Sequence, residues 1–590
     1  MEDHVIKMLL NRIENYGSGE IIRFREKTRK SWTWNHLGEK VEQVLTGLNL
    51  LGCREMDSVG IISQNRAEWL VADLGIMANR SVTVPIYATS SPDQIQYIIE
   101  EAEIRILFVG TCEQKDSVKF LLDEVESLEY IVVFDECKVV DERVLSFNRF
   151  IELSGEHGSH ITLNEKVHEY HAEDLATIIY SSGTTGEPKG VMLKHSHFAH
   201  TYRVHQQRLK VSEKDVSLAF LPLSHVFERL WTHFMLYSGV VNVFLDNPRD
   251  VVEAMREVRP TLMCAVPRFF DKTYQGVQAE MSKWSPVKKS IFKWAVSTGL
   301  KANKYRSRSE MMPRLLQFRL SLAEKLVFQK LRNVLGGNIR FMPCAGAALS
   351  DEILKFFHAV GLFITYGYGL TETSATVSCF RDDYYQYGTC GSVMPEVEVK
   401  IGENHEILVK GEGVFSGYFK KEEATREVMT DGWFHTGDKG CLDSRGNLIM
   451  VDRIKDLMKT SVGKYISPQK IETLFASEEL VEQMLVVGDN RPYVTALIVP
   501  LVSKLKMIAQ TKNIEVEDED ELLYSKEVNE AFEEYMHELQ EHLAPYERVK
   551  KFALLQHPFT IEDGTMTNTL KLRRRHIEKK YQDVIDKLYA

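Results

Sequence analysis

The first half of the chain alternates short apolar, β-branched runs with longer amphipathic stretches. The runs predict strands at residues 59–63, 82–88, 105–110 and 130–135. The stretches 66–80 and 92–102 have helical periodicity and predict helices. This order is typical of parallel sheets covered by helices on both faces. Further strand-like runs start near residues 175, 261, 339 and 361. Ligands bind beyond the carboxyl ends of such strands, so we search for a site in the loops that follow them.

The pattern changes after about residue 391. Gly-punctuated alternating segments at 397–411 and 440–453 predict antiparallel hairpins. A strand pair within 483–501 and acidic helices across 515–543 predict a smaller α+β unit. No low-complexity linker separates the two parts. We therefore expect an α/β protein with a large N-terminal domain at 1–454 and a small C-terminal domain at 455–590, joined by a short hinge.

Composition narrows the class of protein. The chain of 590 residues is 44% hydrophobic and 27% charged, which is typical of a globular protein with large cores. Its net charge of −11 argues against a nucleic-acid partner recruited by a basic field. Eight scattered cysteines without a CxxC pair favour free thiols in a reducing cytosol over disulfides or zinc. No segment has the roughly 20 apolar residues of a membrane span. We expect a cytoplasmic protein.

The strongest chemical pattern is SSGTTGEPKG at 181–190, directly after a strand-like run. Its glycines let the backbone approach a ligand, and its hydroxyls and lysine suit phosphate oxygens. The spacing differs from GxxxxGK[ST], which excludes a P-loop NTPase. The string resembles the phosphate loop of the adenylate-forming (ANL) superfamily. By this resemblance the nucleotide-binding residues here are Ser181, Ser182, Gly183, Thr184, Thr185, Gly186 and Lys189.

Four more motifs follow in the order of that family. In LPLSHVFER, at 221–229, the resemblance places His225 beside the substrate carboxylate in the acyl pocket. The adjacent Ser224 does not make a hydrolase pair with it, because neighbours on a strand point to opposite faces and no GxSxG elbow is present. CAGAALS and TYGYGLTET supply the residues that the resemblance assigns to ATP, namely Gly346, Ala347, Tyr368, Gly369 and Thr371. Tyr368 would stack on the adenine.

The resemblance also assigns a metal site, ribose contacts and a catalytic lysine. Glu372 and Thr184 would hold Mg²⁺, a hard cation that prefers oxygen ligands. Asp438 and Arg453 match the residues that contact the ribose, and Lys571 matches the catalytic lysine. Two positions depart from the family pattern, Lys439 and Asn568.

The implied reaction is an ATP-dependent ligation of a long-chain fatty acid to CoA. A carboxylate attacks the α-phosphorus of ATP, pyrophosphate leaves, and the acyl group then passes to the CoA thiol. The catalytic residues would be Lys571, Thr184, His225 and Glu372. Lys455 falls at the family's hinge position, and rotation there would bring Gly463 and Lys464 toward CoA.

Long-chain specificity is implied by LPLSHVFER, by AVPRFFDKTY at 265–274 and by the ending LKLRRR. In that branch an apolar tunnel buries the acyl tail. The resemblance also implies a distorted β-barrel-like subdomain in the large domain.

Several alternatives stay open. The substrate could instead be a medium-chain or aryl acid, which would use the same adenylation motifs. An acyl-carrier-protein ligase or a luciferase-like oxygenase would use these motifs as well. A non-catalytic scaffold is disfavoured because Lys189, Glu372, Asp438 and Lys571 are all present. Of the histidines in 195–205, only His197 and His200 share a helical face, and we expect no Cys or carboxylate to complete a tetrahedral set, which argues against a metal cluster. Peripheral contact with the inner face of a membrane and a homodimer remain open.

Overall fold

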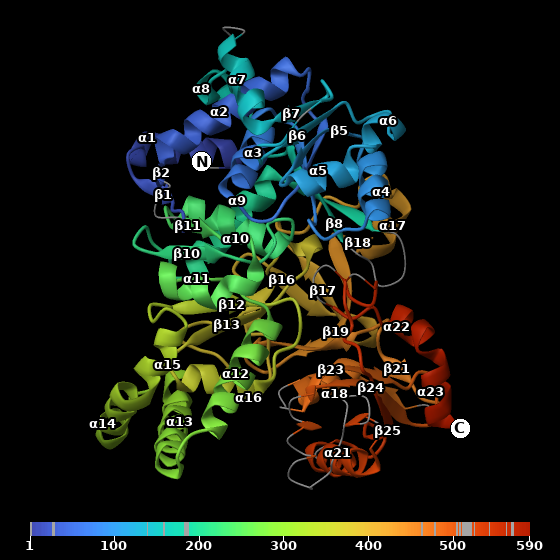
Figure 1. Cartoon of the computed structure of the whole chain (residues 1–590). Helices are drawn as coiled ribbons and strands as arrows, with labels where there is room; N and C mark the ends of the chain where they lie inside the picture. The colour runs from blue at the N-terminus through green and yellow to red at the C-terminus, as the bar shows by residue number, and fades with distance from the viewer. Residues whose placement is uncertain are drawn as a thin grey trace.

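The structure is a computed structural model (Figure 1). It describes residues 3–590 apart from 26–29, 139, 157–159, 182–187, 462–463, 477–479, 503–504, 507–508, 510–521, 524, 542, 562 and 568–570.

A seven-stranded sheet forms one half of the large domain, in the order β7-β6-β5-β3-β4-β8-β9. Its strands are β3 (Ser58–Ile62), β4 (Val82–Ile86), β5 (Ile104–Val109), β6 (Tyr130–Val133), β7 (Val144–Ser146), β8 (Leu175–Ser181) and β9 (Lys189–Lys194). Neighbours are parallel except β8 and β9, which form an antiparallel hairpin. The helices of this region are α1 (Val5–Tyr16), α2 (Trp34–Leu50), α3 (Ala67–Ala78), α4 (Pro92–Ala102), α5 (Cys112–Val118), α6 (Leu121–Glu124), α7 (Phe147–Glu156) and α8 (Leu163–Lys166). The predicted parallel α/β pattern is confirmed.

Two four-stranded sheets form the other half. One has the order β10-β11-β1-β2 and comprises β10 (Val216–Ala219), β11 (Val241–Phe244), β1 (Glu20–Ile22) and β2 (Trp32–Thr33). The other runs β12 (Phe341–Cys344), β13 (Phe363–Tyr368), β14 (Ser378–Cys379) and β15 (Ser392–Val393). Single bridges from Leu262 to Ser217 and to Phe341 connect the two sheets. The carboxyl ends of β8, β12 and β13 therefore lead into loops that can share one site.

Helices from the middle of the chain surround these sheets, and α13 and α14 project away from them at the lower left of Figure 1. They are α9 (His195–Arg208), α10 (Val226–Tyr237), α11 (Val251–Val258), α12 (Pro267–Ser282), α13 (Pro286–Arg306), α14 (Arg314–Ala323), the π-helix η3 (Glu324–Phe328), α15 (Gln329–Val334) and α16 (Asp351–Ala359). Short 3-10 helices are η1 (Val167–Glu169), η2 (Pro248–Asp250), η4 (Thr371–Thr373) and η5 (Glu403–His405).

An antiparallel sheet completes the large domain. It consists of β16 (Glu398–Ile401), β17 (Glu406–Lys410), β19 (Trp433–Leu442), β18 (Met429–Thr430) and β20 (Leu448–Arg453), with α17 (Glu422–Val428) beside it. Both predicted hairpins are confirmed. Register shifts between Glu406 and Leu408 and between Lys439 and Gly440 mark bulges, which bend strands and increase their twist.

The C-terminal part is a small α+β unit with its own apolar cores. Its strands are β21 (Met458–Lys459), β22 (Tyr465–Ile466), β23 (Val481–Val487), β24 (Val494–Pro500) and β25 (Val549–Leu554). Its helices are α18 (Pro468–Ala476), α21 (Lys526–Leu539), α22 (Arg574–Lys580) and α23 (Gln582–Tyr589). The predicted strand pair is β23 and β24, and α21 is one of the predicted acidic helices. Residues 515–521 of that prediction lie outside the described residues.

The expectation of unpaired cysteines is wrong for one pair. A disulfide joins Cys112 at the start of α5 to Cys137 in the loop after β6. The two cysteines are 25 residues apart, a spacing that does not indicate a disulfide in the sequence. The parallel pairing of β5 and β6 brings the loops that follow these strands together. Among the described helices, none combines the length and apolar character needed to cross a bilayer.

Candidate functional site

A continuous cavity of about 3620 Å³ lies where the loops after β8, β12 and β13 meet the small C-terminal unit. The large domain contributes Ser181, Gly346 and Tyr368 to its wall, and the small unit contributes Lys455 and Lys571. The other predicted site residues on the wall are Lys189, His225, Ala347, Gly369, Thr371, Glu372, Asp438 and Arg453. Sequence motifs spread over 390 positions thus converge on one cavity.

The β8–β9 hairpin carries the phosphate-loop string. Ser181 and Lys189 are paired across the hairpin, and both line the cavity. The Lys189 ammonium lies 4.9 Å from the ring centroid of Tyr418. The predicted residues Ser182, Gly183, Thr184, Thr185 and Gly186 lie outside the described residues.

Tyr418 is a site residue that the sequence analysis missed. Its hydroxyl donates to Glu372 Oε1 at 2.9 Å, so one ring contacts both the predicted metal ligand and the phosphate-loop lysine. Burial raises the pKa of Glu372, while the Tyr418 hydrogen bond acts in the opposite direction. Tyr418 lies 46 positions from Glu372, and nothing in the local pattern GVFSGYFK marks it. Its backbone bridge to Val191 of β9 is what places it there.

Tyr368, Asp438 and Arg453 form a polar cluster on the nucleotide side. The Tyr368 hydroxyl donates to Asp438 Oδ2 at 2.5 Å, and Arg453 Nε lies 3.4 Å from Asp438 Oδ1. Asp438 and Arg453 face each other in the register of β19 and β20. Burial raises the pKa of Asp438 and the Arg453 charge opposes that rise. Gly369 must be a glycine, because a Cβ there would lie 1.6 Å from the Ala375 carbonyl oxygen.

Lys571 reaches the same part of the cavity from the small unit. Desolvation in the cavity and repulsion from Arg453 lower the pKa of the Lys571 ammonium to about 8. The carboxylates of Asp438 and Asp456 act in the opposite direction. Lys571 therefore changes charge near pH 8.

His225 lies at the N-cap of α10 and not on a strand, so the premise by which we separated it from Ser224 is wrong. Its Nδ1 accepts a hydrogen bond from the Phe227 amide at 3.1 Å. Burial, with a smaller contribution from the nearby Lys571 charge, lowers the pKa of His225 to about 4. Its imidazole is therefore neutral at pH 7, with Nδ1 as acceptor.

A buried ionic network holds α10 in place. The Arg229 guanidinium donates to both carboxylate oxygens of Asp73 on α3, at 3.0 and 2.5 Å, and to the Thr177 hydroxyl on β8 at 2.6 Å. His233 Nε2 lies 3.0 Å from the same carboxylate. These contacts tie the helix that starts at His225 to the strand that leads into the phosphate loop. The arginine of LPLSHVFER thus has a positioning role.

The predicted hinge and CoA-side residues differ in placement. Lys455 lies two positions after the end of β20 and lines the cavity. Lys464 is not on the cavity wall; its ammonium lies 5.6 Å from the Tyr546 ring, and its backbone pairs with Thr460. Gly463 lies outside the described residues.

Part of the cavity wall is largely apolar. We call this part the apolar arm and define it by its apolar lining residues, namely Phe220, Val226, Phe269, Val277, Trp284, Ile291, Phe292, Val327, Leu331 and Leu335. Lys272, Thr273, Glu280 and Lys288 of the same helices also line the cavity. The arm is suited to an apolar chain attached to a polar group near His225.

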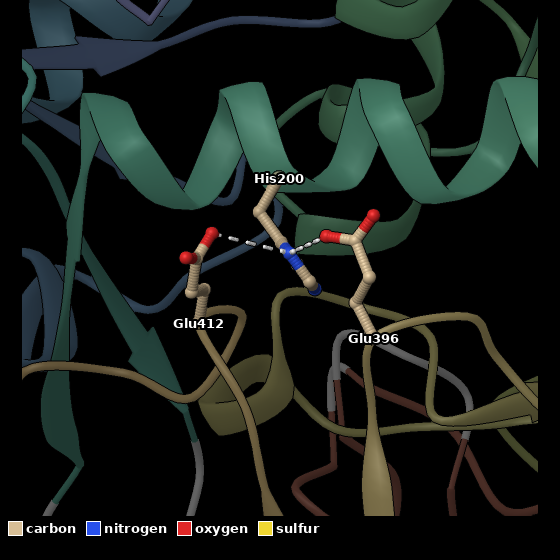
Figure 2. Close-up of side chains that lie close together, drawn as sticks. All are labelled: His200, Glu396 and Glu412. Carbon is tan, nitrogen blue, oxygen red and sulfur yellow. Dashed lines mark ion pairs between the residues drawn. The ribbon is translucent and has the colours of Figure 1, made fainter.

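Figure 2 shows a second cluster, in which His200 of α9 lies between Glu396 and Glu412. Each carboxylate has an oxygen 3.8 Å from His200 Nδ1, so the expectation that no carboxylate accompanies these histidines is wrong. The guanidinium of Arg203 lies 2.8 Å from Glu396 and 2.6 Å from Glu412. The Arg203 guanidinium thus supplies the positive charge that a metal ion would bring to the two carboxylates. The cluster joins α9 to the antiparallel sheet by ion pairs.

Comparisons with known proteins agree with this geometry. Residues 11–419 match the AMP-binding enzyme family, and residues 455–590 match the AMP-binding enzyme C-terminal domain. The peroxisomal long chain acyl-CoA synthetase 7 of Arabidopsis thaliana is 30% identical, covering 98% of this chain and 85% of that protein. The long-chain-fatty-acid–CoA ligase FadD15 of Mycobacterium bovis is 31% identical, with coverages of 95% and 92%.

Solved structures share the fold. An anthranilate CoA ligase in complex with anthranoyl-AMP superposes with a TM-score of 0.75 at 20% identity, covering 99% of this chain and 98% of that one. The adenylation domain of a carboxylic acid reductase from Segniliparus rugosus, in complex with AMP and a co-purified carboxylic acid, gives 0.74 at 20% identity, with coverages of 99% and 94%. The chain therefore belongs to the AMP-binding enzyme family of the adenylate-forming superfamily.

Proposed function

We propose that this adenylate-forming acyl-CoA ligase activates long-chain fatty acids. A carboxylate oxygen attacks the α-phosphorus of ATP, the bond to the bridging oxygen of pyrophosphate breaks, and acyl-AMP forms. The CoA sulfur then attacks the acyl carbon and AMP leaves with the bonding electron pair. The products are acyl-CoA, AMP and pyrophosphate.

The apolar arm of the cavity carries the proposal for the acid. Many of its lining residues on α12 and α13 are apolar, although Lys272, Thr273, Glu280 and Lys288 also line the cavity there. The part of the cavity that contains Asp438, Arg453 and Lys571 is strongly polar. Each buried methylene contributes about 0.8 kcal/mol to binding, so an apolar arm of this extent favours long acids. The names of relatives at about 30% identity support the same substrate class.

We assign roles in adenylation from position in the cavity. The Asp438 carboxylate accepts hydrogen bonds from the ribose hydroxyls, and Arg453 keeps it charged. Lys189 and Lys571 offset negative charge at the phosphates and the substrate carboxylate. His225, neutral and fixed by its Nδ1 hydrogen bond, borders the carboxylate end of the apolar arm.

Glu372 fits the Mg²⁺ that the family implies. Burial raises the pKa of its carboxyl, and a cation beside it would offset that effect. Its oxygens suit a hard cation, which would lower the negative charge of the ATP phosphates when bound. We propose Glu372 and Thr184 as the ligands.

We propose a hinge at Lys455 between domains 1–454 and 455–590. Lys571 lies in the cavity while Lys464 lies away from it, as expected of the adenylating arrangement. Among the described residues, the hydrogen bonds from α12 to the small unit include Arg268 to the Glu482 carbonyl at 2.8 Å and Gln275 to the Ala476 carbonyl at 3.3 Å. Rotation would withdraw Lys571 and present Gly463 and Lys464 to CoA.

The test is CoA-dependent AMP formation with fatty acids of increasing length. We expect kcat/KM to rise with chain length until the apolar arm is filled. Lys571→Ala should abolish acyl-AMP formation, whereas Lys579→Ala, in the same basic stretch but off the cavity wall, should not. A preference for acetate or for aryl acids over long-chain acids would contradict the proposed substrate. Wild-type adenylation by Lys571→Ala would contradict the role of that lysine.

A further inference from the structure

The segment 286–334, comprising α13, α14, η3 and α15, differs in charge from the rest of the chain. It contains twelve Lys and Arg and only two acidic residues, Glu310 and Glu324, a net charge of +10. The whole chain is −11, so the remaining residues carry −21. Among the described residues, only Arg308 and Arg332 of these twelve cations pair with a carboxylate, that of Glu310 and of Glu324 respectively.

The same segment exposes apolar side chains. It holds nine of the seventeen large apolar side chains that are exposed among the described residues. Leu315 and Phe318 are each 64% exposed, and with Leu322 they follow the i, i+3, i+7 spacing of one face of α14. Only Ala323 of that helix is buried. Basic residues Arg314 and Arg319 flank this apolar face.

The projecting helices have a firm base. Ala295 and Ala302 of α13 are fully buried, and Gly299 fits so closely that a Cβ would lie 2.3 Å from the Ala359 carbonyl oxygen of α16. The exposed apolar and basic side chains therefore belong to a fixed surface and not to a fraying end. Figure 1 shows α13 and α14 at the lower left, on the opposite side of the picture from α22 and α23.

The apolar arm of the cavity reaches this surface. Val287 is 70% exposed, and it lines the cavity together with Ile291, Leu326 and Val334, which are also exposed. The exposed cations Lys288 and Lys330 stand on the same wall. Exposed apolar side chains and exposed positive charge therefore meet on this part of the cavity wall.

We propose that segment 286–334 docks the protein on an anionic lipid bilayer, with the apolar side chains of α14 in the headgroup region and the mouth of the apolar arm facing the membrane. Amphipathic helices of this kind bind by burying apolar area and by attraction to anionic lipid. Each Lys or Arg close to such a surface strengthens binding by about fivefold. Binding of this surface to a bilayer does not depend on catalysis. The further idea, that a fatty acid enters the arm from the membrane, rests on the proposed function.

The experiment is sedimentation of the full-length protein with phosphatidylcholine vesicles, with and without phosphatidylserine, at two salt concentrations. Arg314→Glu/Arg319→Glu/Lys325→Glu should weaken binding to the anionic vesicles by at least about a hundredfold. A matched control, Lys526→Glu/Lys550→Glu/Lys579→Glu, changes the same charge on exposed lysines of the C-terminal unit and should bind like the wild type. AMP formation with a short soluble acid should be the same in all three proteins, which shows that they are folded.

A third variant, Leu315→Ser/Phe318→Ser, keeps the charge and should also lose most of the vesicle binding. Equal binding of the wild type to neutral and anionic vesicles would overturn the proposal, as would equal loss in the control triple variant. Full binding by the serine variant would also overturn it, because the surface would then be a general polyanion site. Each of these failures leaves the proposed ligase activity untouched, since that activity is measured on soluble acid.

Discussion

Gly276 offers a direct test of the apolar arm, because replacing it should shorten the acids that the enzyme accepts. It lies in the middle of α12 and lines the cavity, and a Cβ built on it has no other atom within 4 Å. A leucine there would extend into open space at the cavity wall without displacing its neighbours. Glycine is about 0.8–1 kcal/mol less favourable than alanine inside a helix, so Gly276→Leu should also stabilise α12.

The expected size of the effect follows from the carbon atoms that leucine adds. Four side-chain carbons occupy the space of about four methylenes of a fatty acid, each contributing about 0.8 kcal/mol when buried. Long acids would then lose about 3 kcal/mol of binding, or about 200-fold in kcat/KM. Acids too short to reach Gly276 would keep their wild-type rate.

The assay is AMP formation at saturating ATP and CoA over a series of acid lengths. Gly276→Ala serves as a graded control, since one carbon should cost the long acids only about fourfold. A melting temperature at or above that of the wild type would show that Gly276→Leu is folded. If short and long acids lost activity equally, or if the profile did not change, the acid would not lie in this arm.

Three further predictions follow from the polar residues. Only the ammonium form of Lys571 offsets negative charge, so kcat/KM for ATP should fall as the pH rises through about 8. Lys571→Arg, which stays charged, should remove that decline. A wild-type profile that is flat to pH 10 would contradict this prediction. Arg229→Met leaves the Asp73 carboxylate buried without its main partner. The free energy of unfolding, measured by urea titration, should fall by about 3–5 kcal/mol. A loss below about 1 kcal/mol would contradict a charged pair between Arg229 and Asp73. Asp438→Asn should weaken AMP binding by about 10-fold to 100-fold in calorimetry, because hydrogen bonds to a charged acceptor are stronger than those to a neutral one. Tyr368→Phe should weaken AMP binding less. The reverse order would contradict the assignment of Asp438 to the ribose.

The arrangement of strands was readable from the sequence because it depends on local patterns. Apolar runs of four to seven residues separated by helical periodicity predicted β3 to β6 and the helices α3 and α4, and α4 matched its predicted bounds. Its capping box, formed by Ser91 and Gln94, is a local hydrogen-bond pattern. The hairpins β16–β17 and β19–β20 were likewise readable, since each turn lies between the strands it joins. The resemblance then placed the site motifs in order along the chain.

Contacts between distant segments were not readable in this way. Tyr418 joins Glu372 and Lys189, His200 meets Glu396 and Glu412, and Cys112 bonds to Cys137, and none of these sets has a spacing that a sequence pattern records. His225 was assigned to a strand by its neighbours, but the packing of α10 made it a helix cap.

The sequence by itself determined the α/β class, the order of the motifs and the residue types suited to phosphate, ribose and carboxylate. Only the tertiary structure decided that Lys571 and Asp438 share a wall, that an apolar arm continues from His225, and that this arm ends at a basic, apolar surface of α13 and α14. The physical reason is the distance along the chain over which each kind of interaction acts. Helix and strand periodicity repeat within a few residues, whereas a cavity and its electrostatics are set by groups that chain folding brings within a few ångströms from hundreds of positions apart.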